Sequence, residues 1–282
     1  MNRTADVVIV GAGVIGSATA FELAKRGYKT LNIDKLPASG YGSTSNSCAI
    51  VRAHYSTWDG VAMAYEGFFY WDDWNKYLEV EDERGMAKYM KTGSIMFMLK
   101  GADHSKKSLN LFKEIGVEHE IWDLETLKKK MPIYSHDSYN GTSRPDEDDS
   151  FFDKSGDQIE GAVWTPGSGY VSDPQLATHN LQVATESKGG EFLFDAEITE
   201  IRQSNGQIQG VTLKSGEQID CKVLVNVAGP HSFIINQMAG VEDDMNIKTK
   251  ALRHEVHHVS SPPGFDFEKD GVHTSDGDNA IY

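Results

Sequence analysis

Apolar and polar residues follow one another along this chain in patterns that predict an α/β protein. The apolar run DVVIV at 6–10 is bounded by glycine and is typical of a buried parallel strand. Helix-like spacing of apolar residues follows over 14–25 and ends at Gly27, and KTLNID at 29–34 predicts a second strand. Strand, glycine turn, helix and strand in this order form a βαβ unit, so we expect a parallel sheet.

The same patterns predict further elements. Helical periods run over 61–78, 105–115, 124–131 and 174–187, and 92–99 predicts a strand. Short alternating runs over 189–229 predict a β-meander, and this region ends in the apolar strand CKVLVNVAG. Because this buried strand comes so late in the sequence, it indicates that the chain returns to the first domain after forming a separate region. The acidic segment 143–161 predicts a solvated surface excursion rather than a calcium loop, because 153–157 does not match EF-hand spacing.

Composition narrows the class of protein. The 282 residues are 39% hydrophobic, enough for one large domain or two ordinary ones. A net charge of −15 argues against nucleic-acid and anionic-membrane partners, which need clustered positive charge. Cys48 and Cys221 form no CxxC pair, which fits a reducing compartment and predicts a cytoplasmic protein. No apolar run reaches about 18 residues, so no membrane span is predicted.

A glycine motif between the first predicted strand and helix predicts a dinucleotide site. Gly11, Gly13 and Gly16 form GxGxxG, and Asp34 ends the next strand. The first glycine permits a tight turn, the second lets the backbone approach a pyrophosphate, and the third lets helix and strand pack closely. Asp34 is expected to accept a hydrogen bond from a ribose hydroxyl. NAD and FAD both satisfy this fingerprint, and a glycine-rich turn without a ligand is the alternative.

An ordered set of motifs extends beyond this fingerprint. VVIVGAGVIGSATAFELAKRGYKTLNIDK, GSTS, AIVR, GYVSDP and LVNVAGPHS together resemble the D-amino-acid-oxidase-like (DAO) family of FAD-dependent oxidoreductases, in particular its sarcosine oxidase, glycine oxidase and dimethylglycine dehydrogenase branch. The resemblance covers nearly the whole chain and implies FAD as the cofactor. The implied cofactor-binding residues are Gly11, Gly13, Ile15, Gly16, Asp34, Lys35, Ser43, Thr44, Ser45, Ile198 and Gly229.

The resemblance also implies a role for each part of that set. The loop after the second strand wraps the flavin in this family, so the hydroxyl residues 43–45 are expected to contact the pyrophosphate or the flavin. Ile198 lies where such proteins present backbone to the adenine, and Gly229 closes the strand beneath the nucleotide. No histidine stands between 44 and 47, where relatives with covalent flavin can carry one, so that linkage is not predicted.

Two interleaved domains are implied by the resemblance. We expect a Rossmann-type FAD-binding domain over 1–85 and 150–240, and a partial α+β substrate domain over 86–149 and 241–282. Family members continue beyond the counterpart of Tyr282, so we expect this chain to be a C-terminally truncated portion of such an enzyme.

Arg52 is the candidate substrate-binding residue. A guanidinium fork fixes a carboxylate by two parallel hydrogen bonds, and the resemblance implies that Arg52 holds the carboxylate of a small amino acid. The implied reaction is oxidation of the C–N bond of sarcosine, dimethylglycine, glycine or a D-amino acid by hydride transfer to flavin N5. Oxygen or an electron-transfer partner would reoxidise the flavin. The alternative for Arg52 is an ion pair with a structural carboxylate.

The segment RHEVHHV at 253–259 presents a different candidate chemistry. His254 and His258 match HExxH, which binds zinc when it lies on a helix. The segment instead alternates and precedes Ser-Ser-Pro-Pro-Gly, which predicts a strand, where residues four apart are separated by about 13 Å. We therefore predict no metal site. The resemblance makes His254 an active-site candidate, with an ordinary strand histidine as the alternative.

Three other functions remain open from the sequence. An NAD-dependent dehydrogenase would share the fingerprint but would not need the meander and the returning apolar strand. A zinc hydrolase would need RHEVHHV to be helical. A non-catalytic FAD-binding fragment would differ from the enzyme only by lacking turnover.

Overall fold

The computed structural model describes residues 3–101, 103–132, 134–139, 144, 146–151, 153–253, 260, 263, 264, 273 and 274. Its contacts divide the chain into two compact units. The first unit comprises Met1–Ala49, Asp73–Lys88 and Val171–His258, and the second comprises Ile50–Asp72, Tyr89–Tyr170 and Val259–Tyr282. Each unit is therefore assembled from segments that are distant in the sequence.

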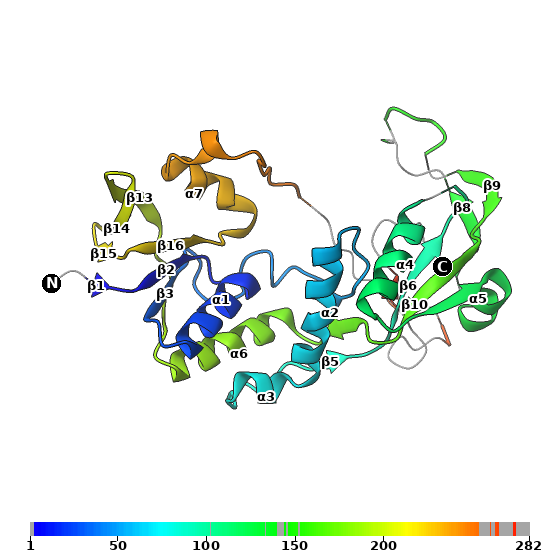
Figure 1. Cartoon of the computed structure of the whole chain (residues 1–282), viewed down its shortest axis with the longest axis horizontal. Coiled ribbons are helices and arrows are strands. Elements are labelled where there is room, and N and C mark those ends of the chain that lie inside the picture. Colours follow the sequence, from blue (N-terminus) through cyan, green and yellow to red (C-terminus); the bar gives the residue numbers. More distant parts are fainter. Residues whose placement is uncertain are drawn as a thin grey trace. The chain divides into compact units, whose positions relative to one another are not determined.

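A four-stranded parallel sheet forms the centre of the first unit (Figure 1). Its strands are β2 (Val7–Val10), β3 (Thr30–Ile33), β12 (Glu191–Leu193) and β16 (Val223–Asn226), in the order β12-β3-β2-β16. Every residue of β2 and β3 is buried, and β2 is a continuous hydrophobic run, whereas β3 also buries the polar residues Thr30 and Asn32. The predicted return of the chain is confirmed, because β16 pairs directly with β2.

Two long helices pack side by side on this sheet (Figure 1). They are α1 (Val14–Lys25) and α6 (Pro174–Ser187), and the bounds of both match the prediction. The buried residues of α1 include the small side chains Ser17, Ala20 and Ala24, of which Ala20 packs with Val7 and Ile9 of β2. The Asp173 side chain caps α6 by accepting hydrogen bonds from the first-turn N–H groups.

A buried polar network fastens the segment 73–88, which contains α3 (Trp74–Leu78), to α6. The Asp82 carboxylate accepts hydrogen bonds from His179 at 2.5 Å and from Asn180 at 2.8 Å. The side-chain amide oxygen of Asn180, Oδ1, in turn accepts a hydrogen bond from the Trp74 indole N–H at 3.3 Å. Burial raises the pKa of Asp82, but hydrogen bonds from the Arg84 N–H, His179 and Asn180 outweigh burial and hold this pKa below its usual value.

The predicted meander forms a second sheet of the first unit. Its strands are β13 (Ile198–Ser204), β14 (Gln207–Leu213) and β15 (Gln218–Asp220), with β1 (Arg3–Thr4) beside β15. Apolar residues of β13 to β15, including Ile201, Val211 and Ile219, share one buried cluster with Val8 and Leu31 of the parallel sheet. This cluster holds the two sheets together. The short helices η1 (Gly229–His231), α7 (Ser232–Met238) and η2 (Glu242–Asp244) follow β16.

The second unit is built on another sheet, in the order β17-β6-β10-β7. Its strands are β6 (Ser94–Met98), β7 (Glu120–Asp123), β10 (Gly161–Thr165) and β17 (His273–Thr274). A smaller sheet joins β4 (Ile50–Val51), β11 (Gly169–Val171) and β5 (Tyr89–Met90), and β8 (Asp137–Tyr139) pairs with β9 (Lys154–Gln158). The helices are α2 (Trp58–Asp72), α4 (Asp103–Ile115) and α5 (Leu124–Lys130).

Three sequence expectations differ from the structure. The helical period over 61–78 is divided into α2 and α3, because Asp73 leaves the helical conformation at φ −109° and ψ 39°. The segment 143–161 contains the strand β9, which is exposed as expected for a solvated segment but which the sequence pattern does not indicate. The sequence pattern does not predict β10, whose five residues GAVWT begin at the end of the acidic segment 143–161. Whether the two units are the FAD-binding and substrate domains stays a prediction, and the contacts place 50–72 and 150–170 in the second unit.

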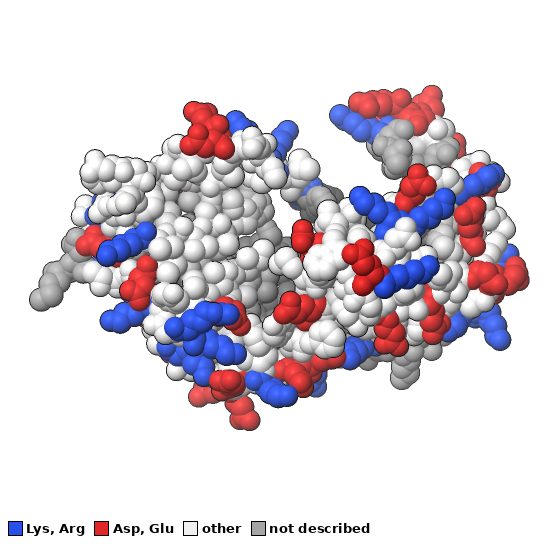
Figure 2. All heavy atoms as spheres, viewed as in Figure 1, with Lys and Arg blue, Asp and Glu red and all other residues white. Residues whose placement is uncertain are grey.

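The surface carries no continuous charge of one sign on the face that is visible. In Figure 2 Lys and Arg side chains lie interspersed with Asp and Glu side chains over that face. The described residues on that face therefore offer no basic stripe for a polyanion. Among the residues that the structure describes, no helix has the length and apolar character needed to cross a membrane.

Candidate functional site

At two positions around the turn between β2 and α1, 11 and 16, there is room for glycine only. Gly11 has φ +114°, and a Cβ placed on it would lie 2.5 Å from the carbonyl oxygen of Val227. A Cβ on Gly16 would overlap the carbonyl oxygen of Gly11. The Gly11 N–H donates to Ile33 at 2.9 Å, so the turn is also tied to the end of β3. The backbone therefore bends tightly at the carboxyl ends of the parallel strands, where open α/β sheets bind ligands.

Asn32 supports this turn from within β3. Its side-chain amide is fully buried and donates to the carbonyl oxygens of Gly11 and Gly16, each at 3.1 Å. Asn32 is not among the site residues that the sequence predicts. A polar residue in the middle of the apolar run TLNI was the available signal, because a buried amide needs partners.

Asp34 lies beside the turn, as predicted. Its carboxylate accepts hydrogen bonds from the Ala12 N–H at 2.8 Å and from the Leu36 N–H at 2.9 Å. The side chain is half-buried, while the neighbouring Lys35 is exposed. The carboxylate is thus held rigidly at the tip of β3 while part of its surface stays accessible. Its predicted contact with a ribose hydroxyl stays a prediction.

The hydroxyl loop reaches the amino end of α1 through Thr44. The Thr44 hydroxyl accepts a hydrogen bond from the Val14 N–H at 3.1 Å, and a Cβ on Gly13 would lie 3.2 Å from the same oxygen. Gly13 itself gives α1 no side-chain cap. Ser43 and Ser45 are exposed, and the Ser45 hydroxyl donates to a carbonyl within its own loop. Of the three hydroxyl residues 43–45, Thr44 is therefore the one that bonds at the glycine turn, and the Gly40 N–H joins the start of the loop to the same turn by donating to the Ala12 carbonyl at 2.8 Å.

The remaining predicted residues of the first unit surround the same strand ends. The segment that leads into β13 hydrogen-bonds along the loop after β3, from the Ala196 N–H to the Asp34 carbonyl at 2.9 Å and from the Asp195 N–H to Leu36 at 3.1 Å. Ile198 is buried at the start of β13. Gly229 is exposed with φ +59°. Ile15, in the first turn of α1, keeps 66% of its side chain exposed.

These residues fit a dinucleotide. Gly11, Gly13 and Gly16 carry no side chains, the amino end of α1 is the positive end of the helix dipole, and Asp34 supplies a fixed acceptor nearby. Gly11, Gly13 and Gly16 would hold a pyrophosphate, and Asp34 would hold a ribose.

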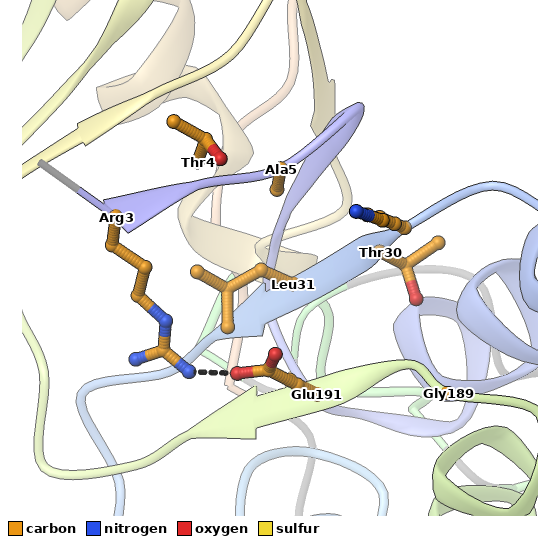
Figure 3. A pocket seen from close by; sticks show the side chains of 8 residues that line it. Arg3, Thr4, Ala5, Thr30, Leu31, Gly189 and Glu191 are labelled. Atoms are coloured by element: carbon orange, nitrogen blue, oxygen red, sulfur yellow. Dashed lines mark hydrogen bonds and ion pairs between the residues drawn. The ribbon is translucent and has the colours of Figure 1, made fainter.

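A hollow of about 240 Å³ lies at the other end of the parallel strands (Figure 3). It is lined by Arg3, Thr4, Ala5, Lys29, Thr30, Leu31, Gly189 and Glu191. The ion pair between Arg3 and Glu191 spans it, as the dashed line in Figure 3 shows. Since these residues precede or begin β3 and β12, the hollow is separate from the glycine turn.

Arg52 belongs to the second unit and follows β4. Its guanidinium is half-buried, donates to the carbonyl oxygen of His54 at 2.6 Å and lies 5.1 Å from the centre of the Tyr55 ring. A planar cation oriented by a backbone acceptor and an aromatic face is suited to bind a carboxylate. His254 and the HExxH segment lie outside the described residues. No cluster of three or more His, Cys, Asp or Glu able to hold a metal occurs in the described part of the chain.

Comparison with known proteins decides the family. The family model described as "DAO: FAD dependent oxidoreductase" matches residues 6–282. The chain belongs to this family. The predicted family and α/β fold class are confirmed, and FAD rather than NAD is the cofactor that the fingerprint serves in this family.

Individual relatives of this DAO-family chain include a putative sarcosine oxidase of Caenorhabditis elegans, 31% identical over 51% of this chain and 36% of that protein. A glycerol 3-phosphate dehydrogenase of Caloramator mitchellensis is 25% identical over 83% of this chain and 43% of that protein. The crystal structure of L-proline dehydrogenase from P. horikoshii matches with a TM-score of 0.68 and 23% identity, covering 86% of this chain and 57% of that one. The chain thus spans between 36% and 57% of the length of these relatives.

Proposed function

We propose that this DAO-family chain binds FAD at the glycine turn and oxidises the C–N bond of a small amino acid or N-methylated amino acid. The observation that carries the proposal is the turn itself, in which Gly11, Gly16 and the Asp34 carboxylate meet at the carboxyl ends of β2 and β3. The family match and the named sarcosine oxidase and proline dehydrogenase relatives support the substrate class.

In this proposal the cofactor is held by the predicted residues of the first unit. Gly11, Gly13 and Gly16 place backbone against the pyrophosphate, and Thr44 keeps the hydroxyl loop at the amino end of α1. The other predicted contacts are Ile15, Asp34, Lys35, Ser43, Ser45, Ile198 and Gly229. When bound, FAD would supply the two-electron acceptor for the amine.

Arg52 binds the substrate carboxylate in this proposal, and the amine is then oriented for loss of its α-hydrogen. The support is the orientation of the guanidinium by the His54 carbonyl and the Tyr55 ring. The amine carbon is oxidised to an imine, which water hydrolyses. Oxygen or a separate electron-transfer partner would reoxidise the cofactor.

Both cysteines have the surroundings of ordinary thiols, which supports a reducing, cytoplasmic compartment. Cys48 and Cys221 are free, and burial raises the pKa of the Cys221 thiol.

The decisive experiment separates cofactor uptake from turnover. The purified chain is incubated with FAD and desalted, and its visible flavin absorbance is recorded before and after acid precipitation. The loaded protein is then mixed without oxygen with sarcosine, glycine, L-proline, D-alanine or glycerol 3-phosphate. We expect noncovalent flavin that is bleached by at least one of the amino acids and not by glycerol 3-phosphate.

Two variants make this experiment specific. Arg52→Gln should retain FAD but raise the amino-acid concentration needed for bleaching about a hundredfold, because one bidentate charge-assisted contact is lost. Arg84→Gln, a matched change at an exposed arginine, should leave bleaching unchanged. Failure to take up FAD would reject the cofactor site, and bleaching by glycerol 3-phosphate alone would reject the amino-acid substrate.

A further inference from the structure

His54 lies two residues after Arg52 and is buried, with 5% of its surface exposed. Its carbonyl oxygen accepts the 2.6 Å hydrogen bond from the Arg52 guanidinium. A guanidinium is planar and its hydrogen bonds are directional, so one such bond strongly restricts the plane in which the remaining N–H groups lie. The position of the His54 backbone therefore determines how Arg52 is presented.

The His54 ring is fastened inside the second unit. Its Nε2 lies 3.2 Å from the hydroxyl oxygen of Thr165, and the ring stacks on Phe112 with centroids 5.6 Å apart. Phe112 and Thr165 are both fully buried. A ring packed on one side and hydrogen-bonded at its tip has a single orientation, and its own backbone is held with it.

The hydroxyl of Thr165 has a defined set of partners. It donates its one proton to the carbonyl oxygen of Ser94 at 3.2 Å, since a carbonyl only accepts. It then has lone pairs left for the Ser168 hydroxyl at 2.8 Å and for His54 Nε2. With the Thr165 proton on the Ser94 carbonyl, the hydrogen bond at His54 Nε2 is the one that a protonated Nε2 donates to the Thr165 oxygen. The network assigns a tautomer as well as an orientation.

The turn that carries Thr165 also reaches the strand before Arg52. Thr165 ends β10, and Gly169 after it begins β11, where Gly169 pairs with Val51 of β4. The Tyr89 hydroxyl donates to the Gly167 carbonyl in this turn at 2.5 Å. Burial raises the pKa of Tyr89, which keeps the hydroxyl protonated as a donor. One turn thus supports the chain on both sides of Arg52.

We propose that His54 is a positioning residue for Arg52, and that the Thr165 hydroxyl sets the orientation of His54. The inference rests on the proposed function for the identity of the ligand, a small carboxylate. The contacts themselves, from Thr165 through His54 to the Arg52 guanidinium, lie within the second unit and need no cofactor.

The first test measures proton exchange at the Arg52 guanidinium itself and requires no enzymatic activity. In the ¹⁵N-arginine-labelled chain, the guanidinium signal that disappears in Arg52→Lys is assigned to Arg52. We expect its Nη protons to exchange slowly in the wild type and in Thr165→Ser, which keeps the hydroxyl. In Thr165→Val, which keeps the shape and loses the hydroxyl, we expect exchange to quicken by at least about tenfold.

Two more variants serve as controls for the loss of another hydrogen bond of Thr165 and for a Thr165→Val variant that does not fold. Ser168→Ala removes a different partner of Thr165 and should leave the Arg52 signal slow. His54→Phe keeps the stacking on Phe112 but loses the hydrogen bond, and it replaces Thr165→Val if that variant does not fold. Slow exchange in both Thr165→Val and His54→Phe, or fast exchange in Thr165→Ser, would overturn the proposal.

The second test measures the consequence for the ligand. With FAD bound, Thr165→Val should raise the KM for the bleaching amino acid about tenfold, with kcat within about twofold, because carboxylate binding is lost equally from ground and transition states. A merely structural role would lower the amount of folded protein without changing KM. If no amino acid bleaches the flavin, the proposed function is wrong. The exchange rates of the Arg52 guanidinium protons still show whether His54 and Thr165 position Arg52.

Discussion

The glycine turn of the first unit and the Arg52 segment of the second unit are two candidate sites built in different ways. In the turn, close approach of backbone atoms determines the geometry: Gly11 and Gly16 have no room for a Cβ, and both carbonyls accept from Asn32. In the Arg52 segment, side chains determine it, and one of them, Thr165, lies 111 residues from its partner His54. A site whose geometry depends on closely spaced glycines can be recognised in the sequence. A site that depends on contacts between side chains far apart in the sequence cannot.

The largest expected effect breaks the turn. Gly16→Ala places a Cβ on the carbonyl oxygen of Gly11, so the helix and strand must separate. We expect a loss of about 3 kcal/mol in the free energy of unfolding, measured in urea, and no retention of FAD after desalting.

The matched control for this change is Gly67→Ala on α2, where nothing lies within 4 Å of the added Cβ. That variant should be neutral or more stable by about 0.5 kcal/mol, because alanine loses less backbone entropy than glycine in a helix. Equal changes in the free energy of unfolding for Gly16→Ala and Gly67→Ala would contradict the claim that close backbone approach determines the glycine turn.

Asn32→Asp tests the side chain that supports the turn. The change is nearly isosteric, but it replaces a donor by an acceptor facing the carbonyl oxygens of Gly11 and Gly16. We expect the free energy of unfolding to fall by about 2 to 3 kcal/mol at pH 7. Asn46→Asp, at an exposed amide that donates to Gly42, should change it by less than about 0.5 kcal/mol. A stable Asn32→Asp protein with unchanged FAD affinity would show that the turn needs no such support.

The hydrogen-bond network of Asp82 beside α6 predicts that the free energy of unfolding depends on pH. It extends the comparison of the two sites, because here side chains support the structure within the first unit. The folded pKa of Asp82 is lowered, so its stabilisation is present above the unfolded pKa of about 4 and is lost as pH falls through the folded value. Asp82→Asn should lower the free energy of unfolding by about 2 kcal/mol at pH 7.

That difference should shrink as the pH is lowered below about 4, as urea unfolding at several pH values would measure. Asp157→Asn, at an exposed ion pair with Lys100, serves as the control and should leave the pH profile unchanged. A wild-type minus Asp82→Asn difference that stays constant to low pH would refute the role of the Asp82 charge.

The smallest expected effect concerns the aromatic face beneath Arg52. Tyr55→Leu removes the ring 5.1 Å from the guanidinium, and Tyr55→Phe keeps it. Because Tyr55 is exposed, we expect Tyr55→Leu to weaken binding of the amino-acid substrate only about threefold and Tyr55→Phe to leave it unchanged. The measurement is the amino-acid dependence of flavin bleaching, and an equal loss in both variants would implicate the hydroxyl instead.

The sequence by itself determined the βαβ unit, the glycine turn, Asp34 and the late return of the chain as β16, because each depends on local spacing or on an apolar run long enough to recognise. It also indicated Arg52 by resemblance to the family. Short strands such as β10 and the division of 61–78 into two helices were missed, since their signals are weaker than the contacts that stabilise them.

Only the tertiary structure decided which side chains support the two sites. Asn32 is an isolated polar residue in a strand until the turn carbonyls are placed above it. His54 and Thr165 are unremarkable in sequence and become one network only when β10 and the chain after β4 are folded together. Buried polar groups need partners, but any of many distant residues can satisfy that need, so the pairing is set by the packed fold and not by spacing along the chain.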